Sequence, residues 1–263
     1  MADATSPAIV VTGASGGIGE ALTYEFARER PTLVLVARSG DALARVAMQA
    51  KERGAARVET VTLDLTQPEA VNDLEQALAA LGLHVETLVN NAGYGLVGPF
   101  AALDEADEIG MVDLNIRALT LLCRRFLPGM IARRKGGIVN LASTAAFAPG
   151  PLMAVYYASK AYVLSLSQAL GAEVKGTRVT VTAVCPGPTH TGFQERAQAG
   201  GTRMMKMFPV MSAAAVASIA YRGHRAGKNV VVTGAFNRVM AASSRLAPPG
   251  LLTTMTMRMN GNK

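Results

Sequence analysis

Tryptophan is absent from this sequence, and cysteine and histidine are scarce, with two and three residues respectively. Cys123 and Cys185 lie far apart and form no CxxC pair, so neither a disulfide nor a zinc site is expected. Buried thiols in a reducing compartment are the favoured interpretation. His84, His190 and His224 are equally scattered. Because these residue types do not cluster at ligand spacing, we expect no metal centre.

The sequence also lacks a long apolar run. No stretch approaches the roughly 20 uninterrupted apolar residues that span a bilayer. Residues 1–7 do not combine a basic segment with an apolar one, and the first apolar run, 8–11, leads directly into a glycine-rich turn. We therefore interpret the N-terminal residues as part of the fold rather than as a signal peptide, and we expect a cytoplasmic protein.

Charged residues make up only 17% of the 263 residues, and the net charge is +7. A basic chain can bind nucleic acid, but the one dense basic cluster is Arg133-Arg134-Lys135, and aromatic residues reach only 5%. A solvated basic surface is therefore favoured over a nucleic-acid interface. Hydrophobic residues make up 50%, which is typical of a globular chain with a sizeable core.

Short aliphatic runs alternate with helical patterns along most of the chain. Helices are predicted at about 41–53, 104–125 and 156–175, among others, and strands at 8–12, 32–37, 58–63, 87–90, 137–142, 178–184 and 229–233. Continuous aliphatic strands are typical of sheets buried on both faces, and the intervening helices imply parallel crossovers. The sequence predicts an α/β fold, a three-layer doubly wound Rossmann sheet of about seven parallel strands with helices on both faces. No linker divides it, so residues 1–263 are expected to form one domain.

A glycine-rich turn follows the first predicted strand. Gly13, Gly17 and Gly19 are spaced G-x3-G-x-G, which differs from the G-x-G-x-x-G dinucleotide fingerprint. Glycines allow a tight turn and a close approach to a pyrophosphate, and the N–H groups that begin a helix point at its negative charge. Such turns also serve ordinary strand–helix packing, so this loop alone is weak support for a nucleotide site.

The residues at the end of the second predicted strand indicate which nicotinamide cofactor would bind. An enzyme that uses NAD normally presents an acidic residue there, about 20 residues past the glycines. This chain has Arg38-Ser39 at that point, 19 residues after Gly19. A guanidinium binds a 2′-phosphate with two charge-assisted hydrogen bonds, whereas a carboxylate would repel it. The pattern therefore favours NADP(H), although the nearby Asp41 leaves NAD(H) as the alternative.

Tyr156 and Lys160 are four residues apart, which places them on one face of the predicted helix. A neighbouring ammonium favours the phenolate and lowers the pKa of a tyrosine, which suits the residue for proton transfer between an alcohol and a carbonyl. Tyr157 lies three residues from Lys160 and points elsewhere, so it is the weaker candidate. Taken alone, a Tyr-x3-Lys pair is usually a solvated helix face.

Several motifs together resemble the short-chain dehydrogenase/reductase family, in its form of about 250 residues that prefers NADP. The resemblance runs in order from about residue 8 to residue 234, and Ser143 precedes Tyr156 by 13 residues, the usual spacing in such members. The motifs are Thr12-Gly13-x3-Gly17-x-Gly19, Asn90-Asn91-Ala92-Gly93, Ser143, Tyr156-x3-Lys160 and Pro186-Gly187.

The resemblance implies a role for each catalytic candidate. Tyr156 would be the acid and base, Lys160 would lower its pKa and hold the nicotinamide ribose, and Ser143 would donate a hydrogen bond to the substrate oxygen. Asn115 matches the asparagine that supports a proton-relay water in the family, and taken alone it also fits an ordinary polar position on a helix.

The resemblance also implies which residues bind the cofactor. Asn91 to Gly93 would flank it, and Arg38 matches the position that marks NADP use in many members, while the family's other basic position is Gly16 here. The complete predicted cofactor set is Gly13, Ser15, Gly17, Ile18, Gly19, Arg38, Ser39, Asp64, Leu65, Asn91, Ala92, Gly93, Tyr156, Lys160, Pro186, Gly187 and Thr191.

In this family a segment that corresponds to about residues 191–212 covers the substrate. Phe193, Met204 and Phe208 lie in it, together with further methionines, and would bind an apolar ketone, aldehyde or alcohol beside Ser143 and Tyr156. Plain packing of a helix is an equally favoured interpretation of these apolar residues. The identity of the substrate cannot be derived from the fold.

The tail at about 235–263 departs from the shortest family members, which end soon after the last strand. It carries methionines, leucines and arginines around Pro248-Pro249. The tail could cover the active site, pack against another subunit or touch a membrane surface. Subunit packing is favoured because the family commonly forms homodimers and homotetramers through two long helices, and membrane contact is the minority interpretation.

The leading functional hypothesis is an NADP(H)-dependent oxidoreductase that interconverts a carbonyl and an alcohol. The alternative from another class is a regulator or scaffold that senses NADP(H) with little turnover. Such a protein could lose Ser143, Tyr156 or Lys160 freely, whereas this chain has all three. Sugar epimerases and dehydratases share the fold, but their chains are usually longer.

Overall fold

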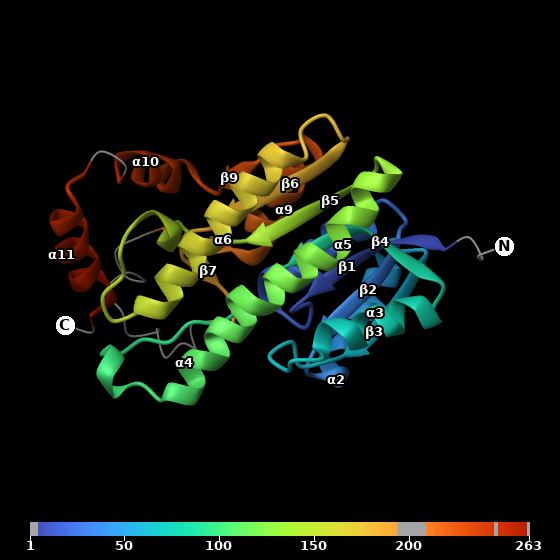
Figure 1. Cartoon of the computed structure of the whole chain (residues 1–263), viewed down its shortest axis with the longest axis horizontal. Helices are drawn as coiled ribbons and strands as arrows, with labels where there is room; N and C mark the ends of the chain where they lie inside the picture. Colours follow the sequence, from blue (N-terminus) through green and yellow to red (C-terminus); the bar gives the residue numbers. More distant parts are fainter. Residues whose placement is uncertain (1–4, 194–208, 245–246, 262–263) are drawn as a thin grey trace.

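The computed structural model describes residues 5–193, 209–244 and 247–261, and its centre is a seven-stranded parallel sheet (Figure 1). The strand order is β3-β2-β1-β4-β5-β6-β9, and every neighbouring pair is parallel. The predicted doubly wound sheet of about seven strands is therefore confirmed. In the part of the chain described here, no helix is long and apolar enough to cross a membrane.

The strands form where the sequence is continuously aliphatic. Val10 and Val11 on β1, like Val34 and Leu35 on β2, have no exposed surface, because helices cover both faces of the sheet. The strands are β1 (Ser6–Thr12), β2 (Thr32–Ala37), β3 (Arg57–Thr62), β4 (Leu83–Asn90), β5 (Gly136–Leu141), β6 (Val179–Cys185) and β9 (Val230–Val232), and a separate short pair joins β7 (Thr189–His190) to β8 (Met211–Ser212).

Two apolar cores separate the sheet from its two helical layers. One core joins the sheet to α3 (Ala70–Ala80), α5 (Leu119–Arg133) and α6 (Ala154–Glu173). The other joins it to α1 (Gly17–Ala27), α2 (Gly40–Glu52) and α9 (Ala213–Arg225). Cys123 and Cys185 are free and buried, as the sequence predicts. After β9 the chain forms α10 (Ala235–Ser243) and α11 (Pro249–Asn260), at one end of the molecule in Figure 1.

The helix expected at about 104–125 is longer and less regular than the prediction. It comprises α4 (Glu105–Val112), a π-helical segment (Asp113–Ala118) and α5, which continues past Pro128 to Arg133. A proline inside a helix removes a backbone hydrogen bond and usually ends the helix. Leu127 and Met130 are buried against the sheet on either side of Pro128, and their burial favours continuation.

The strand order reverses between β1 and β4, and side chains connect the ends of these two strands. The Thr12 hydroxyl donates to the Val89 carbonyl (3.1 Å) and accepts from the backbone N–H groups of Asn91 (3.0 Å) and Ala92 (3.1 Å). The Asn91 side-chain amide donates to the carbonyls of Thr12 and Gly13, both at 3.0 Å. Ligands of doubly wound sheets bind beside such a reversal, so these contacts position the candidate site.

Candidate active site

A cavity of about 960 Å³ lies at the carboxyl edge of the sheet, lined by the segments that follow β1 to β6. Of the predicted cofactor residues, all except Gly19 line it. Ser143, Tyr156, Lys160 and Phe193 line it as well, whereas Asn115 does not. Met204 and Phe208 lie outside the described residues. No group of three or more His, Cys, Asp or Glu side chains that could hold a metal occurs among the described residues.

The glycine loop forms an open backbone cradle. Gly13 and Gly17 have φ angles of +63° and +58°, which glycine adopts without strain. A Cβ atom on Gly19 would lie 2.3 Å from the carbonyl oxygen of Gly13, so this glycine serves close packing beneath the loop. A Cβ atom on Gly16 would meet nothing within 4 Å. The cradle opens at the start of α1, where backbone N–H groups favour an anion, so the residues present fit a dinucleotide.

The segments after β2 and β3 border the same end of the cavity. Arg38 is exposed there, and its guanidinium makes no ion pair within the described part of the chain. Ser39 caps α2 by accepting a hydrogen bond from the Ala42 N–H at 3.4 Å. The Asp64 carboxylate accepts from the backbone N–H (3.0 Å) and the hydroxyl (2.8 Å) of Thr66, which folds that turn. Asp41, the residue on which NAD(H) was kept as the alternative cofactor, does not line the cavity.

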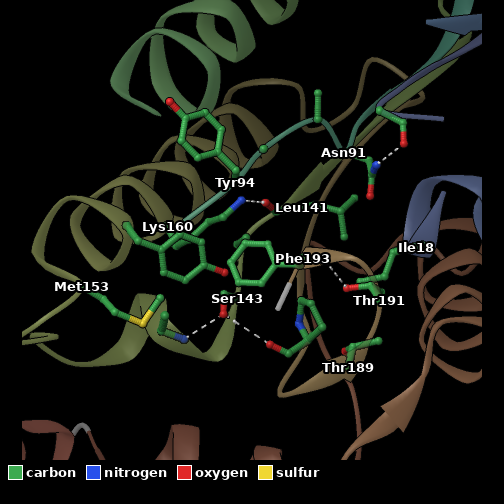
Figure 2. A pocket seen from close by; sticks show the side chains of 18 of the residues that line it. Ile18, Asn91, Tyr94, Leu141, Ser143, Met153, Lys160, Thr189, Thr191 and Phe193 are labelled. Atoms are coloured by element: carbon green, nitrogen blue, oxygen red, sulfur yellow. Dashed lines mark hydrogen bonds between the residues drawn. The ribbon is translucent and has the colours of Figure 1, made fainter. Parts of the chain in front are cut away.

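Ser143, Tyr156 and Lys160 line the opposite end of the cavity. Figure 2 shows Ser143 and Lys160 with their hydrogen bonds. Ser143 follows β5, and its hydroxyl accepts from the Ala145 N–H at 3.1 Å and donates to the Pro186 carbonyl at 3.5 Å. Lys160 lies one turn after Tyr156 on α6. Its ammonium donates to the Leu141 carbonyl at 2.7 Å and lies 5.8 Å from the centre of the Tyr156 ring.

The surroundings of Tyr156 and Lys160 shift both pKa values in the direction that favours the uncharged side chain. Desolvation raises the pKa of Tyr156 to about 12, although part of its ring faces the cavity, and a hydrogen bond with Ser143 acts in the opposite direction. Burial lowers the pKa of Lys160 to about 8. Desolvation is the largest influence on the pKa of Tyr156, and the lowering of that pKa by Lys160 stays a prediction.

Asn115 lies behind the cavity, in the π-helical segment. Its side-chain amide donates to the Tyr94 carbonyl (2.9 Å) and to the Ser159 hydroxyl (3.1 Å), and its oxygen accepts from the Tyr94 N–H (3.2 Å). A Cβ atom on Gly93 would lie 2.9 Å from that oxygen and 3.4 Å from the Lys160 ammonium nitrogen. Asn115 therefore braces the segment after β4, and support of a relay water stays a prediction.

Comparison with known proteins identifies the family of this chain. The sequence model of the short chain dehydrogenase family matches residues 7–201, about three quarters of the chain. The chain belongs to the short-chain dehydrogenase/reductase family.

Individual relatives agree with this assignment. The very-long-chain 3-oxoacyl-CoA reductase of Bos taurus is 34% identical over 181 residues, which cover 67% of this chain and 57% of the relative. The chain therefore matches little more than half the length of that protein. A short-chain dehydrogenase from Sphingobium yanoikuyae, solved with NADPH, is 31% identical with a TM-score of 0.79, and the match covers 91% of this chain and 94% of that one. A member from Burkholderia phymatum, solved with NAD, is 27% identical with a TM-score of 0.79 over 94% of both chains.

The segment after β6 closes the cavity of this short-chain dehydrogenase near Ser143. Thr191 lies against the start of α1, since a Cβ atom on Gly17 would lie 3.1 Å from its methyl group. The ring of Phe193 is tilted by 49° against the Tyr156 ring, with 5.3 Å between their centres. A Cβ atom on Gly187 would lie 2.4 Å from the Asn237 side-chain nitrogen, so α10 packs directly on the Pro186-Gly187 turn.

Sequence reasoning missed a second group of lining residues, which lies on α10 and α11. These side chains are mostly apolar and border the cavity beyond Ser143; they are Phe236, Asn237, Met240, Ala241, Ser244, Leu252, Met255, Thr256 and Met259. The tail thus covers part of the cavity, which was one of the three alternatives. The signal that could have identified it is the four-residue spacing of Leu252, Thr256 and Asn260.

Buried hydrogen bonds hold α11 in this place. The Thr256 hydroxyl donates to the Pro149 carbonyl at 2.7 Å, and the Asn260 side-chain amide donates to the Pro151 carbonyl at 2.9 Å. Tyr157 donates its hydroxyl to the Asn260 side-chain oxygen at 3.2 Å. Asn260 has no exposed surface. Tyr157, which also lines the cavity, therefore anchors the tail through its hydroxyl.

Proposed function

We propose that this protein is an NADP(H)-dependent oxidoreductase that interconverts a carbonyl and a primary or secondary alcohol. The observation that carries the proposal is the layout of one cavity. Ser143, Tyr156 and Lys160 meet at one end, and Arg38 is exposed at the other. A dinucleotide spans the distance between such groups in doubly wound folds.

The nucleotide would lie along the carboxyl edge of the sheet. The cradle before α1 would hold its pyrophosphate, and the Arg38 guanidinium would bind the 2′-phosphate. Asn91 to Gly93 and Pro186-Gly187 would flank its nicotinamide half. When bound, the cofactor supplies the hydride that reduces the carbonyl carbon. The NADPH complex of the Sphingobium relative supports this choice, and the NAD complex of the Burkholderia relative keeps NAD(H) as the less favoured cofactor.

Tyr156 would move the proton of the reaction. In reduction its phenol donates a proton to the carbonyl oxygen as the carbon gains the hydride, so the two-electron step yields a neutral alcohol. Ser143 would donate a hydrogen bond to the same oxygen while negative charge develops on it. Lys160 lies 5.8 Å from the Tyr156 ring centre, and it would stabilise the phenolate that remains.

The raised pKa of Tyr156 predicts different pH profiles for oxidation and for reduction. Below its pKa of about 12 the phenol is protonated, so the acid needed for reduction is present throughout the neutral range. Oxidation needs the phenolate, whose fraction rises tenfold with each pH unit below the pKa. Between about pH 6 and pH 8, kcat/KM for alcohol oxidation should therefore rise steeply while kcat/KM for carbonyl reduction changes little. Equal slopes in both directions would contradict the assignment.

The substrate would be an apolar carbonyl compound. The part of the cavity beyond Ser143 is bordered by Phe193, Met240, Leu252 and Met259, together with other apolar side chains. Apart from Lys160, no lysine or arginine among the described residues lines that part, so the described lining is better suited to an apolar group than to an anionic one. Methionine side chains adapt to different shapes, which favours a bulky substrate over a single small one.

We further propose that residues 1–263 act as one domain in the cytoplasm, with a substrate lid at 191–212. The assembly would be a homodimer or homotetramer formed through the two long helices, α5 and α6. Leu121 and Ile131 on α5 are large apolar side chains with 40% and 37% of their surface exposed. Their burial between copies would stabilise such a contact.

The direct test is a panel of ketones, aldehydes and alcohols assayed through the absorbance of the reduced nicotinamide, with NADPH and NADH in parallel. Turnover of bulky apolar carbonyls with NADPH is the expected result. Binding of NADPH without turnover of any compound would instead favour a regulator that senses NADP(H). Failure to bind either cofactor would refute the proposal as a whole.

A further inference from the structure

The outward sides of α10 and α11 expose an unusual share of the protein's apolar surface. Ten large apolar side chains are exposed among the described residues, and five of them lie on these two short helices. Phe236 is 45% exposed and also lines the cavity. The others are Val239 (67% exposed), Leu251 (53%), Met255 (42%) and Met257 (48%), and we call these four side chains the tail face.

The tail face lies on helices that are firmly packed on their other side. Leu251, Met255 and Arg258 follow one another at four- and three-residue steps along the outer side of α11. Thr256 and Asn260 are buried on its inner side, where they make hydrogen bonds to the Pro149 and Pro151 carbonyls. The exposed apolar side chains of α11 therefore lie on a helix that is anchored from its other side.

The charged side chains on the two helices that carry the tail face are of one sign. Neither α10 nor α11 contains an acidic residue, and both described arginines on them, Arg238 and Arg258, are exposed. The imbalance extends further along the chain, because residues 174–263 contain twelve lysines and arginines but only one acidic residue, Glu195. The preceding 173 residues contain fourteen basic and eighteen acidic residues.

The exposed apolar side chains and the positive charge together favour a lipid surface over a second copy of the chain as the partner of the tail face. A second copy placed face to face would bring these arginines toward one another with no carboxylate on either helix, which is electrostatically unfavourable. A bilayer with anionic lipids matches both the apolar side chains and the positive charge, since aliphatic side chains enter the headgroup region while arginines bind lipid phosphates. The tail face also adjoins the cavity, because Met255 belongs to both.

We propose that the tail face docks this protein reversibly on the surface of an anionic lipid bilayer. Docking would turn the cavity bordered by Phe236 and Met255 toward the lipid, from which an apolar substrate could enter. This last point rests on the substrate class proposed above. Docking itself does not, because it depends only on the outer surface.

The test measures co-sedimentation of the full chain with vesicles of phosphatidylcholine, prepared with and without phosphatidylserine. We expect binding that requires phosphatidylserine and weakens as salt is raised. The double substitution Leu251→Ser/Met257→Ser should weaken it at least tenfold, because two apolar side chains no longer enter the interface. Arg238→Gln/Arg258→Gln should remove most of the dependence on phosphatidylserine.

Two matched variants control for surface changes elsewhere. Met48 is 58% exposed on α2, and Arg124 is exposed on α5, outside the cavity. Met48→Ser and Arg124→Gln should bind vesicles like the unmodified protein. Circular dichroism and NADPH binding check that every variant is folded.

Three results would overturn the proposal. One is the absence of sedimentation with phosphatidylserine vesicles, and another is equal binding by the tail-face and control variants. The third is a concentration-dependent dimer, seen by light scattering, that Leu251→Ser/Met257→Ser abolishes, since the tail face would then contact a second copy. Because sedimentation needs no turnover, a failure here differs from a failure of the proposed oxidoreductase function.

Discussion

Tyr156→Phe is expected to lower kcat for carbonyl reduction by about 10²- to 10⁴-fold, the usual contribution of a positioned acid. The substitution removes one hydroxyl and keeps the ring that lies 5.3 Å from Phe193, so the packing of the site should survive. Binding of NADPH, measured by fluorescence, should change little. Steady-state kinetics on the best substrate of the panel provides the measurement.

Two other tyrosines on the same helix make this experiment specific. Tyr157→Phe removes the hydrogen bond to Asn260, and Tyr162→Phe removes the contact between its hydroxyl and that of Thr120 at 2.8 Å. Neither hydroxyl is assigned a part in the proton transfer, so both variants should keep kcat within a few-fold of the unmodified protein. Retention of full turnover by Tyr156→Phe would refute the mechanism, and a comparable loss in Tyr157→Phe would show that the wrong tyrosine was chosen.

Arg38→Gln is expected to raise KM for NADPH by about 10- to 100-fold and to leave KM for NADH almost unchanged. The magnitude corresponds to about 1.5–3 kcal/mol, the contribution of hydrogen bonds to a charged group. Arg38 is exposed on the cavity and is not engaged by a carboxylate among the described residues, so its donors are available to a 2′-phosphate. The ratio of kcat/KM for the two cofactors is the informative quantity.

An arginine outside the cavity controls for the loss of positive charge. Arg30 is exposed between α1 and β2 and does not line the cavity, and Arg30→Gln should leave the cofactor ratio unchanged. An unchanged NADPH preference in Arg38→Gln would refute the cofactor assignment. Equal losses for both cofactors would show that Arg38 supports the site without reading the phosphate.

The sheet and the two ends of the cavity could be predicted because they depend on local, periodic signals. An aliphatic run such as 32–37 predicts a buried strand from its own residues alone. Tyr156 and Lys160 come together within one turn of a helix, so their proximity is also a local property. The glycine loop and Arg38 follow strands directly, so placing the strands also placed these residues.

Features that depend on distant contacts could not be predicted in the same way. No sequence pattern indicates which segment the tail packs against. Its position depends on contacts such as the hydrogen bond from Asn260 to Pro151, which are 109 residues apart. The high pKa of Tyr156 is also a collective property, since it arises from desolvation by the surrounding elements. The π-helical segment at Asn115 has no sequence signature of its own.

The bracing of the glycine loop by Asn91 has a consequence for how tightly a nucleotide can bind. Because the Asn91 amide holds the carbonyls of Thr12 and Gly13, the loop acquires its shape from the pairing of two strands and not from the ligand. A preorganised loop loses little conformational entropy when a dinucleotide arrives, so more of the interaction free energy appears as affinity. By reciprocity, a bound nucleotide would stabilise the junction of β1 and β4, so the free energy of unfolding would rise with cofactor concentration.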